Sequence, residues 1–272
     1  MKKRTPFIHL LMFVIVFISL APIMWVFVSS FKTYSEINSS ALSLPAALNF
    51  NNYAAAFKYA PILKYFLNSV VIVGASILVT ATIVAMSAYA TQRFRFRFKS
   101  VIIALIAASL LLPAQSISQP LFTIFTSLNI FDTKIGLILV YSAMGIPMSF
   151  FVMFSYYMTI PTEIEEAAYI DGAGFFRAFA TIILPLAKPG LATIAILQFI
   201  NTWNEFYFAL VLTSGDRART VPIALNYYMS TFANNYSALF AAVILTVAPT
   251  IVFFVIMQKQ VIDSLTTGAV KG

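Results

Sequence analysis

Cysteine is absent from this chain of 272 residues, and histidine occurs once, as His9. Without cysteine, disulfides and thiolate metal sites are excluded. Charge is also scarce, since Asp, Glu, Lys and Arg make up 10% of the residues, where soluble domains carry about 25%. Most of the molecular surface therefore cannot face water.

Chemical motifs are missing as well. The sequence has no G-x-x-x-x-G-K-[ST] loop, which would cradle the phosphates of a nucleotide. It also shows no pair of carboxylates, no cluster of metal ligands and no nucleophile placed beside a base. We therefore expect a protein that is not an enzyme, with no catalytic residues, no metal and no cofactor.

Long apolar stretches dominate what is present. Four of them lack any Asp, Glu, Lys or Arg: residues 7–31, 65–92, 100–131 and 135–160. Each exceeds the roughly 20 residues that a helix needs to cross a bilayer. The net charge of +8 comes from basic residues in short connectors, where they act as topology signals. We therefore expect membrane lipid, and no nucleic acid, as a partner.

The fold class follows from the bilayer. Because lipid offers no partner to backbone polar groups, the spans should be helices. We predict an all-α, polytopic membrane protein with a single transmembrane domain over residues 1–272. Its six helices are predicted near 7–31, 65–91, 100–124, 135–159, 189–213 and 236–258. The first stretch is longer than the roughly 7–15 residues of a signal-peptide core, so we expect a retained helix.

Basic residues predict the orientation. With both termini inside, eleven of the 17 Lys and Arg residues lie in internal segments and six in external ones. Positive charge accumulates on the cytoplasmic side, so both termini are predicted to be cytoplasmic. The segment 93–99, in which basic residues alternate with phenylalanine, contributes most. Two connectors are long: the external 32–63, where short surface helices are expected, and the internal 161–188.

The internal connector is predicted to begin as a helix. Thr162 and Glu165 have the spacing of a capping box, in which each side chain bonds to the backbone N–H of the other residue. Gly172 is predicted to end this helix in a left-handed conformation. A second helix should run over 175–183 until Pro185 breaks it. The predicted product is a cytoplasmic helix–Gly–helix hairpin.

One face of the first predicted helix is flat. Ile164, Ala167, Ala168 and Asp171 recur at i, i+3, i+4 and i+7, the spacing of one helix face. Because two of these residues are alanines, another protein could approach this face closely.

Polar residues interrupt two of the predicted spans. Ionisable groups inside a membrane usually face a cavity or a partner, and Glu205 is the acidic residue that we place inside a helix. With Asn201, Trp203 and Asn204 it forms a candidate solute pathway of amides, an indole and a carboxylate. A second interpretation stays open, in which Glu205 caps or pairs between helices while Trp203 and Tyr207 form an interfacial aromatic belt.

Gln115 and Gln119, flanked by Pro113 and Pro120, extend the candidate pathway. A polar run between prolines indicates a kinked or unwound helix that lines a cavity. Residues 145–147, Gly-Ile-Pro, indicate another break in the fourth span. Helix–helix packing is the alternative interpretation of both features.

The internal connector also carries a longer motif. Glu166-Ala167-Ala168, Gly172 and Ile182-Ile183-Leu184-Pro185 follow the pattern E-A-A-x3-G-x9-I-x-L-P. This pattern resembles the EAA loop of binding-protein-dependent (MetI-like) importer permeases, and every fixed position matches. Further segments are similar to the carbohydrate branch of that family, including the maltose-type second permease subunit: Leu44-Pro45, Asn52-Tyr53, and residues 65–69, 88–94, 203–206 and 265–272.

The resemblance implies a permease subunit of an ATP-binding-cassette importer, which translocates a sugar or related polar solute by alternating access. In such proteins the EAA hairpin sits in a cleft of an ATPase subunit and passes its movement to the spanning helices. Glu166 would contact a basic group of the ATPase, and Asp171 would cap the second helix; a merely solvated hairpin is the alternative. The implied coupling residues are Glu165, Glu166, Ala167, Ala168, Asp171, Gly172, Ala173, Leu184 and Pro185.

The implied partners are a homologous permease subunit, two ATP-binding-cassette ATPase subunits and an extracytoplasmic solute-binding protein, in the cytoplasmic membrane of a bacterium or archaeon. A heterodimer of permeases is typical of the carbohydrate branch, and a homodimer stays open. The tail after Met257 either reaches the ATPase or is disordered. Two other classes stay open: an ion-coupled secondary transporter of a polar solute, for which Glu205 alone gives thin support, and a membrane scaffold that transports nothing.

Overall fold

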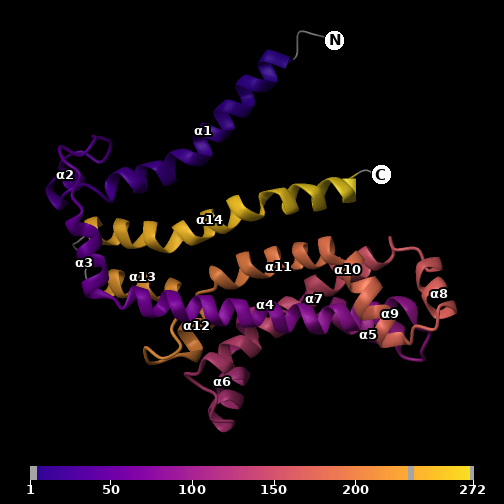
Figure 1. Ribbon diagram of the computed structural model, residues 1–272. Helices are drawn as coiled ribbons and strands as arrows, with labels where there is room; N and C mark the ends of the chain where they lie inside the picture. Colours follow the sequence, from indigo (N-terminus) through magenta and orange to yellow (C-terminus); the bar gives the residue numbers. More distant parts are fainter. Residues whose placement is uncertain (1–4, 232–235, 270–272) are drawn as a thin grey trace. The chain divides into compact units, whose positions relative to one another are not determined.

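The structure, a computed structural model, describes residues 5–231 and 236–269, and these ranges form helices and loops without a strand (Figure 1). The predicted all-α class is confirmed. The chain divides into two compact units. The first comprises Met1–Tyr65 and Val221–Ile251, and the second comprises Phe66–Thr220 and Val252–Gly272.

The first unit contains α1 (Thr5–Ser29), α2 (Tyr34–Ser39), α3 (Asn51–Tyr59), α13 (Val221–Thr231) and the start of α14 (Tyr236–Ala269). The most apolar window of α1 has no buried residue, as suits a helix whose surroundings are lipid or another protein. Near its end, Trp25 packs edge-on against Phe240 of α14, with ring centroids 5.1 Å apart. The short surface helices predicted for 32–63 are present as α2 and α3.

Buried polar groups hold the connector that follows α1. Lys32 is fully buried, and its ammonium donates to the carbonyls of Ser40 and Ala41 at 3.4 and 2.9 Å. The Asn52 amide donates to the carbonyls of Ser30 and Lys32 at 2.8 and 2.9 Å. Because a buried ammonium requires such acceptors, these bonds fix the path of the chain between α1 and α3.

A capping box is present at the start of α2. Thr33 Oγ1 accepts from the backbone N–H of Glu36 at 3.4 Å, and the Glu36 carboxylate accepts from the backbone N–H of Thr33 at 2.7 Å. The same carboxylate also accepts from the N–H of Ala46 at 2.9 Å. These backbone bonds, first to Thr33 and then to Ala46, hold the pKa of Glu36 below its ordinary value of 4.5, because they stabilise the ionised form.

The second unit is built on α4 (Ile62–Arg93), α7 (Lys134–Tyr157) and α11 (Lys188–Trp203). Its core includes Tyr89 and Phe150, both fully buried or nearly so. The helices α7 and α11 approach closely at Gly145, where an added Cβ would lie 1.8 Å from Gln198 Oε1. Gln198 Nε2 donates to the carbonyl of Tyr141 at 2.8 Å, which ties the two helices together.

Shorter elements complete this unit: α5 (Lys99–Ser109), the 3-10 turn η1 (Ala114–Ile117), α6 (Ser118–Ser127), α8 (Glu163–Ile170), α9 (Phe175–Ala178), the π-helical turn η2 (Phe179–Ile183), α10 (Leu184–Leu186) and α12 (Tyr207–Leu212).

Four helices are long and apolar enough to cross a membrane: Ile8–Ser29, Ile62–Arg93, Lys134–Tyr157 and Tyr236–Met257. Two bent pairs have the same character: Lys99–Ser109 with Ala114–Ser127, bent by 100°, and Phe175–Leu186 with Lys188–Trp203, bent by 70°. The described residues therefore provide four spans, or six if each bent pair is one span.

One of the two predicted breaks is present. The third span bends over residues 110–113, beside the polar run that contains Gln115 and Gln119. The break predicted over 145–147 is wrong, because α7 continues through Pro147. A helix can pass a proline at the loss of one backbone hydrogen bond, and Gly145 serves the contact with α11 instead.

Candidate functional site

The internal connector folds as a helical hairpin whose first arm is α8. This helix ends in a Schellman motif, in which Ala173 N donates to Ala168 O at 2.9 Å and Gly172 N donates to Tyr169 O at 3.1 Å. Gly172 has a φ of +83°, the left-handed conformation predicted for it. The turn therefore depends on a conformation that glycine adopts at little cost.

The capping box predicted for this arm is wrong. Thr162 is the N-cap of α8, yet its side chain makes no capping hydrogen bond. Glu165 points into the unit instead, where Oε1 accepts from Arg93 Nε at 2.6 Å and Oε2 accepts from the Tyr89 hydroxyl at 2.7 Å. The side chains of Arg93 and Glu165 are 11% and 7% exposed. A buried carboxylate requires an opposite charge, which Arg93 supplies and Thr162 cannot.

The two faces of α8 have different surroundings. Glu165 and Ala168 are buried, whereas Glu166 and Ala167 are exposed. Ile170, at the end of the helix, is 86% exposed. The face predicted to be flat is therefore divided: Ala168 packs inward, and Ala167 stays accessible to another protein.

The second arm runs farther than predicted. Its first helix starts at Phe175 as expected, with Gly174 as the N-cap, so the predicted capping by Asp171 is wrong. The chain continues through η2 and α10 and bends after Leu186 rather than at Pro185. Pro185 lies in α10, directly after the π-helical turn η2, and does not end the helical run. Two further predicted coupling residues of the hairpin are half-buried: Ala173 and Leu184.

Glu205 lies at a break between α11 and α12, so its predicted position inside one helix over 189–213 is wrong. Its Oε1 accepts from Phe208 N at 2.8 Å, and its Oε2 accepts from Ala209 N at 3.1 Å. The Tyr141 hydroxyl donates to Oε2 at 2.7 Å. The carboxylate therefore caps the start of α12, where a negative charge is favoured. The structure selects the capping interpretation that the sequence left open.

Trp203 belongs to a helix–helix core. Its side chain is 3% exposed, stacks on Phe199 at a centroid distance of 5.4 Å and meets Phe66 edge-on at 5.7 Å. These contacts bury the indole inside the second unit. By contrast, Asn201 and Asn204 are exposed, and the Asn204 amide donates to the carbonyl of Ile200 at 2.8 Å, which helps to end α11.

The two polar runs predicted from the sequence meet in the structure. The Tyr207 hydroxyl, at the start of α12, donates to Ser118 Oγ at 3.0 Å, at the start of α6. Gln115 and Gln119 flank this serine and are exposed. The glutamines therefore lie near the break between α11 and α12, a neighbourhood that the sequence does not reveal.

Polar contacts join connectors at both ends of α7. Before the helix begins, Asp132 accepts from the backbone N–H groups of Ser214 and Gly215, both at 3.1 Å. After the helix ends, the carbonyl of Ile160 accepts from Arg93 Nη2 at 2.8 Å. Two connectors predicted as external thus meet at one end, and two predicted as internal meet at the other.

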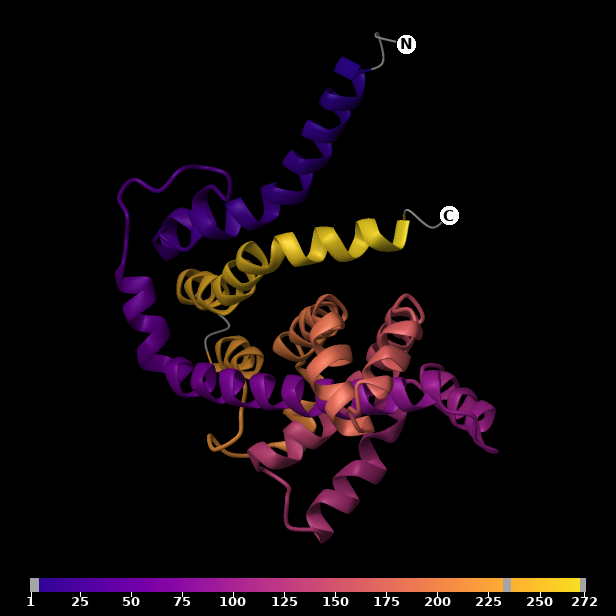
Figure 2. The same ribbon diagram turned by 45° about the vertical axis from the view of Figure 1, so that its right-hand side comes forward.

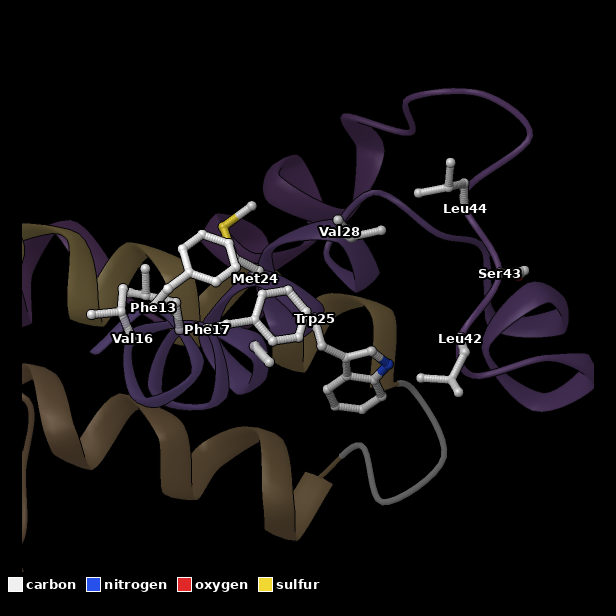
Figure 3. Close-up of a pocket in the computed structure, with 11 residues that line it drawn as sticks. Phe13, Val16, Phe17, Met24, Trp25, Val28, Leu42, Ser43 and Leu44 are labelled. Atoms are coloured by element: carbon white, nitrogen blue, oxygen red, sulfur yellow. The ribbon is translucent and has the colours of Figure 1, made fainter. Parts of the chain in front are cut away.

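An apolar pocket of about 740 Å³ lies along α1. Figure 3 shows α1 side chains, including Trp25, on one wall and Leu42 and Leu44 from the following loop at its end. Its lining is apolar apart from Ser43 and the indole N–H of Trp25, which donates to the carbonyl of Ala41. A sugar needs several convergent hydrogen-bonding groups, so this pocket does not fit a polar solute.

The site offers hydrogen-bonding groups at the ends of helices. Both carboxylate oxygens of Glu165 and of Glu205 accept hydrogen bonds from groups within the unit. Across residues 5–231 and 236–269, no group of three His, Asp or Glu side chains is placed to hold a metal ion.

Comparison with known proteins decides the identity. Residues 53–266 match the family described as binding-protein-dependent transport system inner membrane component. The chain belongs to this family. The permease is 36% identical to the diacetylchitobiose uptake system permease protein of Streptomyces coelicolor, over 96% of this chain and 87% of that protein. It is 35% identical to the trehalose transport system permease protein of Mycobacterium tuberculosis, over 93% of each.

Solved structures support the fold of the permease. A chain of a bacterial ABC transporter involved in the import of the acidic polysaccharide alginate superposes with a TM-score of 0.82 at 22% identity, over 95% of this chain and 98% of that one. Family membership confirms the prediction from the EAA motif: the chain is a membrane-spanning permease subunit of an ATP-binding-cassette importer and not an enzyme.

Three residues of the site are not found by reading the sequence of the permease. The charge pattern assigns Arg93 to topology, and Tyr89 and Tyr141 lie within apolar spans. Arg93 and Glu165 are 72 residues apart. The sequence does contain a signal for an ion pair, because an arginine ends one span and acidic residues lie in a connector on the same side. Only the folded structure shows which of these acidic residues is the partner.

Proposed function

We propose that this permease forms half of the translocation pathway of an importer for mono-, di- or oligosaccharides, with polyols and glycerophosphodiesters as neighbouring substrates. The observation that carries the proposal is similarity over 96% and 93% of the chain to permeases named for diacetylchitobiose and trehalose. Similarity of this extent includes the spans that would surround a solute, and not the hairpin alone.

The hairpin is the proposed contact with the ATPase subunit. Its surface presents Ala167 together with Ile170 and Phe176, which are 86% and 75% exposed. Large apolar side chains exposed outside a lipid-facing span are typical of an interaction surface. Glu166 offers an exposed carboxylate for a charge-assisted hydrogen bond to a basic group. Gly172 sets the angle between the two arms.

The proposed solute pathway lies around the break between α11 and α12 and the start of α6. Trp203 and Glu205 maintain the geometry of this break through their contacts within the unit. Amides suit a sugar because each can donate to and accept from hydroxyl groups. The exposed amides proposed to line the pathway are Asn201, Asn204, Gln115 and Gln119.

The proposed topology is one permease domain over residues 1–272 with six spans. The third span is the bent pair Lys99–Ser109 with Ala114–Ser127, and the fifth begins at Lys188, whose bent partner Phe175–Leu186 belongs to the hairpin. Both termini and the hairpin then lie in the cytoplasm. The excess of positive charge in internal connectors supports this orientation. The meeting of connectors at each end of α7 supports only their division into two sides, because it sorts them into the two sets that the charge pattern predicts. Residues 270–272 of the tail lie outside the described residues, and α14 extends to Ala269.

The proposed assembly contains a second, homologous permease in a heterodimer, two ATPase subunits and an extracytoplasmic solute-binding protein. A related solved structure, with a TM-score of 0.70 and 14% identity, shows an alginate transporter in complex with an oligosaccharide-bound periplasmic protein.

Reconstitution tests the function. Proteoliposomes would contain this chain, its partner permease and the ATPase subunits, with the solute-binding protein outside. Radiolabelled trehalose and diacetylchitobiose serve as probes, and growth of a deletion strain on a panel of sugars selects further ones. We expect uptake to require enclosed ATP. An ion-coupled transporter would instead take up solute with this chain alone under an ion gradient, and that result would refute the proposal.

Crosslinking tests the contact with the ATPase. Because the chain has no cysteine, a single introduced thiol reports one position. Ile170→Cys, on the exposed end of α8, should form a disulfide with a thiol placed in the cleft of the ATPase. Ser214→Cys, in the connector at the opposite end of α7, is the matched control. If Ser214→Cys crosslinks and Ile170→Cys does not, the proposed orientation is reversed.

A further inference from the structure

Both arms of the hairpin are fastened to the last turns of α4. In the first arm, the carboxylate of Glu165 accepts from Arg93 at 2.6 Å and from Tyr89 at 2.7 Å. In the second arm, the rings of Phe175 and Phe179 pack against Tyr89, with centroids 5.7 and 4.8 Å away. Figure 1 and Figure 2 both show α8 and α9 beside this end of α4. One short segment of α4 therefore holds two arms at once.

The same segment also holds the end of α7. Arg93 Nη2 donates to the carbonyl of Ile160 at 2.8 Å, just after this helix. Within its last turn, the Tyr157 hydroxyl donates to the carbonyl of Ala85 at 3.1 Å, and its ring lies 5.5 Å from that of Tyr89. The hairpin, α4 and α7 thus meet around one guanidinium group.

The hydrogen bonds at this meeting point are directional. A guanidinium donates through a rigid planar fork, and both oxygens of Glu165 are engaged at hydrogen-bond distance. Apolar contacts alone would hold the elements together but would let them slide. Because the ion pair is buried, a single unpaired member is strongly unfavourable, so Arg93 and Glu165 act as a unit.

We propose that Arg93, Glu165 and Tyr89 form a joint that transmits movement of the hairpin to α4 and α7. The inference rests on the proposed contact between the hairpin and the ATPase. The three are positioning residues, because the exposed Glu166 and Ala167 would make that contact. Without the joint, the hairpin still follows the ATPase, but the spanning helices no longer follow the hairpin. ATP is then hydrolysed without a matching uptake of solute.

The test replaces both charges in the assembled importer. Arg93→Leu combined with Glu165→Leu leaves no lone buried charge, and such paired apolar replacement commonly preserves stability. Uptake of radiolabelled trehalose and diacetylchitobiose and release of phosphate are measured in the same proteoliposomes. We expect uptake per ATP hydrolysed to fall about tenfold, the usual size of a coupling between two sites, while hydrolysis persists. An unchanged ratio of uptake to ATP hydrolysis in this variant would overturn the proposal.

Two further variants keep the test decisive. Glu163→Gln changes an exposed carboxylate in the same first turn of α8 and should leave the ratio unchanged. If the double variant does not assemble, Tyr89→Phe decides, because it removes one hydroxyl and keeps the ring contacts. Its ratio should fall roughly fivefold, as for loss of one typical intramolecular hydrogen bond, and an unchanged ratio contradicts the proposal. Absence of ATP-driven uptake in the wild type would instead count against the proposed function.

Discussion

At the scale of single residues, two glycines of the hairpin turn serve different purposes. Gly172 has a φ of +83°, whereas Gly174 has a φ of −73°. A Cβ added at either position meets no atom within 4 Å. Both positions therefore have room for a side chain, and the two glycines differ only in backbone conformation. The left-handed conformation costs an L-residue roughly 1–2 kcal/mol.

We expect Gly172→Val to lower ATP-driven uptake by roughly 5–30-fold, the factor that corresponds to about 1–2 kcal/mol of strain in the competent hairpin. Gly174→Val is the matched control and should stay close to wild type, since valine adopts that conformation without strain. Gly172→Asn should lie between them, because asparagine tolerates the left-handed region. Uptake is normalised to the amount of protein in the membrane. Equal uptake by both valine variants contradicts the role of Gly172.

The lowered pKa of Glu36 predicts a pH dependence in the connector that follows α1. Its folded pKa is lowered, mainly by the backbone N–H groups of Thr33 and Ala46. The stabilisation is therefore fully present above the ordinary pKa of 4.5 and is lost as the pH falls through the lower folded value. Hydrogen-exchange protection of the Ala46 amide, corrected for intrinsic rates, should decrease over that window. Glu36→Gln should show weaker protection without this pH dependence; the same acid-induced loss in both proteins contradicts the assignment.

At the scale of the elements, one glycine and one glutamine hold α7 and α11 in register. A Cβ at Gly145 would lie 1.8 Å from Gln198 Oε1, far inside any allowed contact. Gln198 cannot withdraw without losing its hydrogen bond to the carbonyl of Tyr141 at 2.8 Å. Residues 145–147 therefore serve packing between two helices and do not interrupt one.

Gly145→Ala should destabilise the permease by about 1–3 kcal/mol, as expected for overpacking in a well-filled contact. Adding Gln198→Ala should recover part of this loss, because it removes the side chain that clashes. Thermal unfolding in detergent gives the coupling energy of the pair through a double-mutant cycle. Gly74→Ala on α4, where nothing lies within 4 Å of an added Cβ, controls for glycine replacement in a helix. Additive effects of the first two changes would exclude the contact.

At the scale of the whole molecule, the hairpin and a polar contact between connectors lie at opposite ends of the long helix α7. The helix α7 has 24 residues, or about 36 Å at 1.5 Å per residue, which exceeds the hydrocarbon core of about 30 Å. The hairpin lies at one end of α7, and the contact between Asp132 and the connector of Ser214 lies at the other. A rigid helix of this length can relate events on the two sides of a bilayer.

Single thiols on this cysteine-free chain should report the two sides. A membrane-impermeant maleimide should label Ser214→Cys in intact cells, because its connector is predicted to be external. Thr162→Cys, at the exposed start of the hairpin, should be labelled only after the membrane is permeabilised. Both variants should retain ATP-driven uptake. Labelling of Thr162→Cys in intact cells would place the hairpin outside and exclude the ATPase contact.

Several features could be predicted because they depend on short windows of the chain. The apolar stretches 65–91 and 135–159 correspond to α4 and α7 within a few residues. The left-handed Gly172 follows from the end of a helical pattern, and the EAA motif predicts the family. In each case the deciding interaction, backbone hydrogen bonding or transfer of apolar length into lipid, acts over neighbouring residues.

The errors share another physical origin. Glu165 is predicted to form a local capping box, yet its partner Arg93 is 72 residues away. Glu205 is predicted to lie inside one helix, yet it lies at a helix break and accepts from Tyr141, which is 64 residues away. A buried carboxylate binds any hydrogen-bond donor that tertiary packing places within reach. That donor can come from a distant part of the sequence. Composition and local pattern thus determined the membrane class, the helices and the hairpin turn. Only tertiary packing decided which buried charges pair and which helices they join.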